Sequence, residues 1–204
     1  KIGLVYNFNR EEADLTKSLV HPYVPRFPRH VSYDLVLFGS WRRKGVYVES
    51  GKQIASPGSY PVAGFNFAPM YNLNYKFRFG VSLDGVYDGS ANVYTEDALV
   101  EYDAGSGSSR RKFLVPGIQN QLALGLSGRA EYVMPFFTIG VGLGTNVLGR
   151  GDLRGLYQVF ALKIDVTRSS FLHIGYNLQN FQTPNYLMLG LGFRFNNKYP
   201  KVRH

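Results

Sequence analysis

The chain has 204 residues, with 23 basic against 14 acidic side chains and a formal net charge of +9. This length suits a single domain, and a hydrophobic content of 45% excludes a chain that is disordered throughout. The sequence has no cysteine and no run of 18 apolar residues, which excludes disulfides, cysteine-ligated metal sites and a transmembrane helix. Only 18% of residues are charged, whereas 15% are aromatic and 23 are glycine, so we expect an all-β protein.

Residues 1–29 form the first unit that the sequence suggests. Residues 1–8 alternate as a strand does, but Pro22, Pro25 and Pro28 do not fit a central strand. We therefore expect an arm or an extra strand ahead of the main domain. No signal peptide is visible at its front, so an exported protein with this sequence would be a mature or trimmed chain.

The main domain consists of eight segments in which apolar residues alternate with small or polar ones. In one of them Phe79, Val81 and Leu83 share a face, and such a period of two indicates a strand with two different environments. The segments exceed the about 5–6 residues of an ordinary strand and reach the about 9–11 that cross a membrane. They comprise residues 31–42, 61–73, 76–88, 118–134, 136–148, 155–166, 170–180 and 185–196.

The links between these segments alternate in length. Short turns at Asn74, Pro135 and Arg168 alternate with longer links at residues 43–60, 89–117, 149–154 and 181–184. This pattern is typical of an up-and-down outer-membrane barrel. The sequence thus predicts an eight-stranded antiparallel transmembrane β-barrel at residues 30–196, with short periplasmic turns and longer extracellular loops. The arm at 1–29 and a basic tail at 197–204 would lie on the periplasmic side.

A soluble eight-stranded cup, apolar inside and polar outside, is the alternative. Such a cup needs an outer surface rich in Lys and Glu, whereas the polar faces here carry small residues such as Gly140 and Gly142. Small residues suit the narrow interior of a barrel, and the opposite aliphatic faces suit lipid. We expect lipid to contact Phe79, Leu83, Ile139, Val141, Leu189 and Leu191. Aromatic girdles would be formed by Tyr33, Trp41, Tyr75, Tyr132, Phe136 and Tyr157.

Charged residues on the inward faces balance in number. Because buried charges have to be paired, we expect a single hydrogen-bonded cluster that plugs the periplasmic half of the barrel, with Asp84 above it. A catalytic acid–base pair is the alternative, but no nucleophile accompanies these charges in a recognisable arrangement. The set comprises Asp34, Arg78, Asp84, Arg129, Glu131, Lys163, Asp165 and Arg194.

Histidine offers few candidates for chemistry. His30, Ser32 and Asp34 share one strand face, but residues two apart on a strand lie about 7 Å apart, beyond the reach that a catalytic triad needs. His173 points inward on the segment 170–180, where an interior structural role competes with a catalytic one. No spacing of metal ligands appears, so we expect neither a metal nor another cofactor.

Basic residues cluster where the longer links meet the strands. Such clusters would bind the phosphate groups of lipopolysaccharide, or they would form a solvated rim. Nucleic acid would also explain the charge, but the sequence has no nucleic-acid-binding motif. The clusters contain Arg42, Arg43, Lys44, Arg110, Arg111, Lys112, Arg150 and Arg154.

Four glycine- and aromatic-rich stretches stand out in the predicted barrel: VSLDGVYD (81–88), GRAEYVMPFF (128–137), GLYQVFALK (155–163) and NYLMLGLGFRF (185–195). They resemble the acyloxyacyl hydrolase or lipid A 3-O-deacylase (PagL-like) barrels of Bacteroidetes. The resemblance covers residues 30–196. It implies an eight-stranded outer-membrane barrel that removes an ester-linked acyl chain from lipid A.

The resemblance also implies where catalytic residues would lie. Active members use a His-x-Ser pair on the penultimate strand and an acid on the last strand, whereas His173 is followed by Ile174 and Gly175. Alignment of the closing strands instead places Asn180 at the histidine position and Met188 at the glutamate position. His173 and Asn180 are therefore the catalytic candidates, in a site that is not intact.

Two functional hypotheses follow. The first is a lipid A deacylase, a carboxylic ester hydrolase acting through a rearranged site. The second is a catalytically silent structural or accessory barrel that binds lipopolysaccharide or a partner protein. A narrow pore is disfavoured because side chains fill the interior of an eight-stranded barrel. In each case we expect a monomeric integral outer-membrane protein in contact with lipid and lipopolysaccharide, and no nucleic-acid partner.

Overall fold

The structure is a computed structural model that describes residues 25–47, 53–56, 58–103, 108–181 and 183–198. Its long strands are β1 (His30–Arg42), β4 (Tyr60–Asn72), β5 (Phe77–Asp88), β8 (Leu122–Val133), β9 (Phe137–Leu148), β10 (Leu156–Asp165), β11 (Ser170–Gln179) and β12 (Thr183–Phe195). Two hairpins and two 3₁₀ turns complete the described chain: β2 (Gly45–Tyr47) with β3 (Gln53–Ala55), β6 (Tyr94–Asp103) with β7 (Ser108–Leu114), η2 (Ile118–Asn120) and η3 (Gly151–Leu153).

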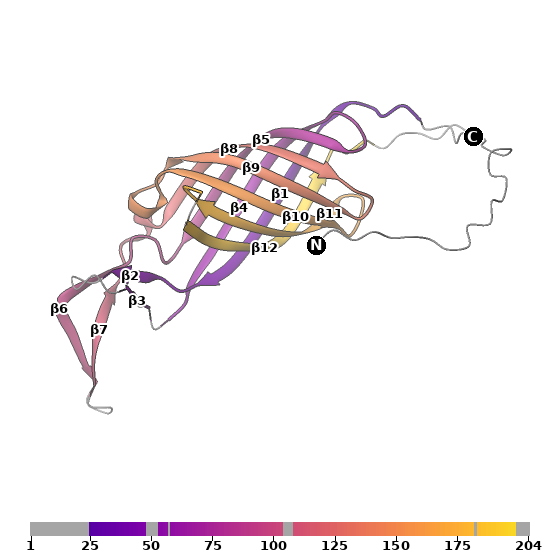
Figure 1. Cartoon of the computed structure of the whole chain (residues 1–204). Coiled ribbons are helices and arrows are strands. Elements are labelled where there is room, and N and C mark those ends of the chain that lie inside the picture. Colours follow the sequence, from indigo (N-terminus) through magenta and orange to yellow (C-terminus); the bar gives the residue numbers. More distant parts are fainter. Residues whose placement is uncertain (1–24, 48–52, 57, 104–107, 182, 199–204) are drawn as a thin grey trace, which may run out of the picture.

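The eight long strands form one closed antiparallel barrel (Figure 1). Each strand pairs with its neighbours along the barrel sequence, and β1 closes the barrel by pairing with both β4 and β12. The predicted eight-stranded antiparallel barrel is thereby confirmed. No helix in the described part of the chain is long and apolar enough to cross a bilayer.

The two ends of the barrel differ in their connections. At the short-turn end, tight turns join β4 to β5, β8 to β9 and β10 to β11; in the first, Asn74 Oδ1 accepts hydrogen bonds from the backbone N–H groups of Lys76 and Phe77, each at 2.8 Å. At the loop end, Figure 1 shows the hairpins β2–β3 and β6–β7 projecting beyond the barrel. The sequence did not predict these hairpins, which lie inside two of the longer links. The predicted start of the segment 118–134 was also wrong, because Ile118–Asn120 form a 3₁₀ turn and β8 begins only at Leu122.

Side chains alternate between the barrel interior and its outer wall. The outer wall is apolar: Phe79 is 50% exposed, Val141 48% and Leu191 55%. Ile139 and Leu189 are exposed on the same wall, and Leu83 is half-buried there. The outward orientation predicted for these residues is confirmed, so the apolar faces do not form the core of a soluble cup.

The barrel interior is divided into two halves. Towards the loop end it is filled by apolar and aromatic residues, among them Phe38 and Tyr186, whose rings stack at 6.1 Å. Towards the short-turn end it holds charged residues, including Asp34, Arg78 and Lys163, all buried.

The first unit that the sequence suggested lies mostly outside the described residues. Residues 25–29 are described, and they contain no strand. Tyr75 donates a hydrogen bond to the Pro25 carbonyl at 2.5 Å, and the rings of Phe27 and Tyr75 meet edge-on at 4.9 Å. This segment therefore packs against the short-turn end of the barrel.

Candidate functional site

Asp34 is the centre of a buried ion-pair network near the short-turn end. Its carboxylate accepts hydrogen bonds from Lys163 Nζ at 2.8 Å, Arg78 Nη2 at 2.9 Å and Arg194 Nε at 3.1 Å. Glu131 contacts two of the same cations, with Lys163 Nζ at 2.6 Å and Arg78 Nη2 at 2.5 Å. Asp165 reaches Arg194 Nη1 at 3.5 Å. Three cations and three carboxylates from five strands thus neutralise one another; we call them the Asp34 network.

Arg129 and Asp84 form a second, separate network nearer the loop end. Arg129 Nη2 lies 2.9 Å from both oxygens of Asp84. Four neutral donors complete the carboxylate shell at 2.6 to 2.7 Å: Ser82, Ser127, Tyr157 and Asn66. The expectation of one cluster containing Arg129 was wrong, because the Arg129 side chain extends past Ser127 to Asp84 instead of joining the carboxylates around Asp34. Tyr157, predicted for an aromatic girdle, points inward as part of this second network.

Glycines on β9 make room for these charged side chains. A Cβ atom at Gly142 would lie 2.7 Å from Arg129 Cδ, and one at Gly144 would lie 2.6 Å from Tyr157 Cζ. A Cβ at Gly140 would approach Glu131 Cγ at 3.2 Å. The glycine face of β9 therefore belongs to the interior because neighbouring strands fill its space with larger polar side chains.

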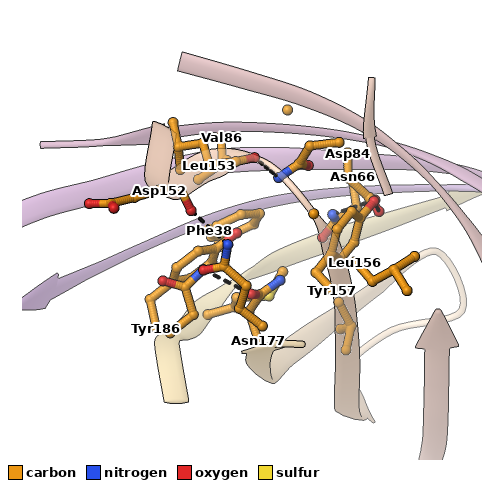
Figure 2. A pocket seen from close by; sticks show the side chains of 17 residues that line it. Phe38, Asn66, Asp84, Val86, Asp152, Leu153, Leu156, Tyr157, Asn177 and Tyr186 are labelled. Carbon is orange, nitrogen blue, oxygen red and sulfur yellow. Dashed lines mark hydrogen bonds between the residues drawn. The ribbon is translucent and has the colours of Figure 1, made fainter. Parts of the chain in front are cut away.

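A cavity lies in the loop-end half of the interior (Figure 2). Aromatic residues (Phe38, Tyr157, Tyr186) and amides (Asn66, Asn177) line it, and Asn177 accepts a hydrogen bond from Asn185 at 3.1 Å. The free space measures about 20 Å³, which holds about one water molecule. A second interior cavity, lined by Asp34, Glu131, Lys163 and His173, is equally small. Neither admits a sugar or an acyl chain.

His173, the first catalytic candidate, is enclosed in the barrel interior. It is 3% exposed, lies opposite Lys163 on β10, and neither ring nitrogen has a hydrogen-bond partner among the described residues. The second cavity beside it is large enough for a water molecule that would bind these nitrogens. No serine or carboxylate of the described residues hydrogen-bonds to His173, and Asp34 and Glu131, which line the same cavity, are held by Arg78 and Lys163.

Asn180 and Met188, the positions matched to the family's histidine and glutamate, lie apart from each other. Asn180 follows β11 at the loop end with a φ of 50°, and its backbone N–H donates to the Leu156 carbonyl at 3.0 Å. Asparagine tolerates this left-handed conformation, so its role here is that of a turn residue. Met188 is buried in the interior at 1% exposure.

His30, Ser32 and Asp34 on β1, the residues considered above as a catalytic triad, each form hydrogen bonds with other partners. His30 Nδ1 lies 2.7 Å from the Pro28 carbonyl, and its Nε2 accepts a hydrogen bond from the Lys198 backbone at 3.0 Å. Ser32 accepts one from Asn72 at 2.8 Å, and Asp34 serves its three cations. His30, Ser32 and Asp34 therefore form no proton relay, as their spacing predicted.

The basic residues of the loop end divide into engaged and available side chains. Arg42 reaches inward to Asp88 at 3.2 Å and to Asn185, and Lys44 contacts Asp152 at 2.5 Å. Arg43, Arg150 and Arg154 are exposed, and of these only Arg150 has a partner among the described residues, Asn120 at 3.4 Å. The side chains of Arg110, Arg111 and Lys112 lie outside the described part of the structure.

Asp152 joins three of the longer links at the loop end. It contacts Lys44 from the first link and accepts a hydrogen bond from the backbone N–H of Asn92, in the second link, at 3.0 Å; Asn92 Oδ1 accepts in return from the Asp152 N–H at 2.9 Å. Burial alone would raise the pKa of Asp152, but the hydrogen bonds from Lys44 and Asn92 and the positive charge of Lys44 hold it below its ordinary value. This contact joins the link that carries Arg43 to the link that carries Arg150 and Arg154.

A groove of about 440 Å³ runs along the outer wall across β5, β8, β9 and β10. Small outward-facing residues, Gly128 and Ala130, form its floor, and Phe79, Val141 and Phe160 line it. Gln158 lies within it, 4% exposed, with its Oε1 accepting a hydrogen bond from the Phe181 N–H at 2.8 Å and its Nε2 unpartnered among the described residues. The groove was not predicted from the sequence. Alternation along β10 does place Gln158 on the outer face between apolar residues, and this polar residue on an apolar face could have indicated it.

The fold and its interior place this chain among small antiparallel β-barrels that are closed by eight strands and filled by side chains. The family model described as "Acyloxyacyl hydrolase, C-terminal domain" matches residues 31–197, and the chain belongs to this family. No curated protein sequence matches the chain.

The solved structures similar to the chain at low identity include two outer-membrane proteins. One is Ail, the attachment invasion locus protein of Yersinia pestis, solved with the heparin analogue sucrose octasulfate: 14% identity, TM-score 0.41, covering 83% of this chain and 100% of that one. The other is the NanC porin: 12% identity, TM-score 0.30, covering 81% of this chain and 100% of that one.

Proposed function

We propose that this protein is an integral outer-membrane barrel that binds the lipid A part of lipopolysaccharide at its loop end without hydrolysing it. The observation that carries the proposal is the position of His173: it lies inside the barrel, beside a cavity with room for about one water molecule, and has no serine or carboxylate partner among the described residues. An acyl ester in the surrounding lipid has no route to this imidazole.

The outer wall supports a membrane location. Exposed aliphatic and aromatic side chains cover the outer wall all around the barrel. An apolar surface of this extent would promote aggregation in water. Short turns at one end and longer loops at the other fit the orientation of outer-membrane barrels, with the short-turn end in the periplasm.

The membrane location can be tested at Val141. Val141→Arg places a charge on the middle of the outer wall and is expected to lower the free energy of unfolding from lipid vesicles by about 2–4 kcal/mol. The matched control is Val115→Arg, since Val115 is 57% exposed in the link that precedes η2, outside the barrel wall. Urea titration of both variants in vesicles measures the difference, and equal stabilities would contradict a lipid-facing wall.

Two features support binding of lipid A. The rim carries Arg43, Arg150 and Arg154 on two links that the contact between Lys44 and Asp152 joins, and guanidinium groups form charge-assisted hydrogen bonds with phosphate. The outer groove offers an apolar channel for an acyl chain, lined by Phe79, Val141 and Phe160. A phosphorylated, acylated sugar lipid presents both kinds of group.

The test combines catalysis and binding on the same preparation. The refolded barrel is incubated with lipid A, and the lipid is weighed by mass spectrometry; we expect an unchanged mass. Loss of an acyl chain would favour the second candidate, a lipid A deacylase as the family match suggests. If the wild type removes an acyl chain and the variant His173→Asn or Asn180→Ala does not, the substituted residue belongs to a rearranged active site.

Binding is measured with lipid A and with its dephosphorylated form. Replacement of Arg43, Arg150 and Arg154 by glutamine is expected to weaken binding of lipid A about tenfold or more, since a loss of ~1.4 kcal/mol is tenfold. Dephosphorylated lipid A should bind both proteins equally. Arg29→Gln at the opposite end is the control that should change nothing, and equal loss in this control would contradict the loop-end site.

A further inference from the structure

A larger, open pocket lies at the short-turn end. It has a volume of about 530 Å³, within the range of about 300–1,000 Å³ of small-molecule sites. Its floor is the outer side of the Asp34 network, where Arg78, Asp165 and Arg194 line it. Its rim carries Lys76, in the turn from β4 to β5, and Lys198, just beyond β12. We call this space the vestibule.

The vestibule carries an excess of positive charge. Within the Asp34 network, Asp34, Glu131 and Asp165 balance Arg78, Lys163 and Arg194, three against three. Lys76 and Lys198 come in addition; both are exposed, and neither ammonium group has a partner among the described residues. Below them, Arg78 and Arg194 add the positive electrostatic potential of two guanidinium groups to the floor. The space therefore favours an anion.

Part of the vestibule wall is apolar and is held by contacts with the barrel and the chain beyond β12. Phe27, Val133 and Met134 line it, and Phe27 packs edge-on against Tyr75. His30 joins the two chain segments at the mouth, since its ring contacts the Pro28 carbonyl, Asn197 Oδ1 at 3.3 Å and the Lys198 backbone N–H. An ordered wall lowers the cost of ligand binding because little has to become ordered on association.

We propose that the vestibule is a binding site for a small amphiphilic anion, a carboxylate or phosphate monoester on an apolar body. The anionic head would lie between Lys76 and Lys198, above Arg194, and the apolar body against Phe27, Val133 and Met134. Binding here would take place on the opposite end from the lipid A site and independently of it. A ligand of this kind would reach the barrel from the periplasm.

The experiment uses four probes on the whole protein in a neutral detergent at low ionic strength: phenyl phosphate, benzoate, inorganic phosphate and benzyl alcohol. Isothermal titration is expected to give saturable binding of phenyl phosphate or benzoate and none of benzyl alcohol. The aromatic anion that binds more tightly identifies the head group. The double variant Lys76→Met, Lys198→Met should bind at least about tenfold more weakly, and salt should weaken binding to the wild type.

Two controls separate this site from the loop end and test its apolar wall. Arg43→Met with Arg154→Met removes two cations from the loop end and should leave the four titrations unchanged, whatever its effect on lipid A. Phe27→Ala should reduce the preference for phenyl phosphate over inorganic phosphate. The proposal is overturned if neither aromatic anion binds saturably, if the lysine double variant binds as the wild type does, or if inorganic phosphate binds as tightly as phenyl phosphate.

Discussion

Replacement of Asp34 by alanine is expected to lower the free energy of unfolding by about 3–5 kcal/mol, because it leaves buried cations without a partner. Asp34 contacts Lys163, Arg78 and Arg194, and its side chain is 1% exposed. Only Glu131 and Asp165 remain to balance these three cations. Urea unfolding from lipid vesicles measures the loss, and Glu131→Ala should follow with a cost of the same order.

The control for this experiment is a carboxylate at the barrel surface. Asp152 also contacts a lysine, but its side chain is 49% exposed, and exposed ion pairs contribute about 0–1 kcal/mol. Asp152→Ala should therefore unfold close to the wild type. If Asp34→Ala and Asp152→Ala unfold at the same urea concentration, the Asp34 network does not stabilise the barrel and its buried charges need a functional explanation.

Replacement of Gly142 by leucine is the second change with a large expected effect. Its first side-chain carbon would lie 2.7 Å from Arg129 Cδ, so Arg129 has to leave Asp84 or the strands have to separate. Overpacking of an interior costs about 1–3 kcal/mol, and a broken buried ion pair about 3–5 kcal/mol. We expect a loss within this combined range, or failure to refold, in vesicle refolding followed by circular dichroism.

Gly128→Leu is the matched control on the neighbouring strand. Gly128 points outward, and the nearest atom to its added Cβ would be the Leu143 carbonyl oxygen at 4.0 Å. The same substitution should therefore fold with nearly wild-type stability in a bilayer. Equal damage from both leucines would mean that glycine serves the backbone of these strands rather than the space inside them.

The barrel itself could be predicted because its signal is local. In each strand, alternation of apolar and polar residues indicates one face towards lipid and one towards the interior, as with Phe79, Val81 and Leu83. The alternation of short and long links indicates that neighbouring strands pair in up-and-down order. Inward charges could be selected by the same parity. Which of these charges form ion pairs could not be predicted, since that depends on the direction in which each side chain extends. Arg129 and Glu131 are two residues apart on β8, yet they belong to different networks.

The candidate sites were predicted less well because they depend on contacts between distant links. Nothing local distinguishes Lys44, engaged by Asp152, from the exposed Arg43 beside it. Tyr157 was assigned to a girdle by its position near a strand end, although its parity with Lys163 indicates the interior that the structure shows. The vestibule combines residues from near both ends of the described chain, Phe27 and Lys198, which no sequence pattern links.

The pairing of Asp34 with Arg194 has a consequence for how the barrel closes. These two residues are direct partners in the register between the first and last barrel strands. A slip of two residues at this seam would keep every apolar side chain on the outer wall, so hydrophobicity alone does not oppose it. It would, however, move the carboxylate and the guanidinium apart by about 7 Å along the strands. The ion pair therefore favours the correct register between β1 and β12 during assembly over a register shifted by two residues, which hydrophobic burial does not distinguish.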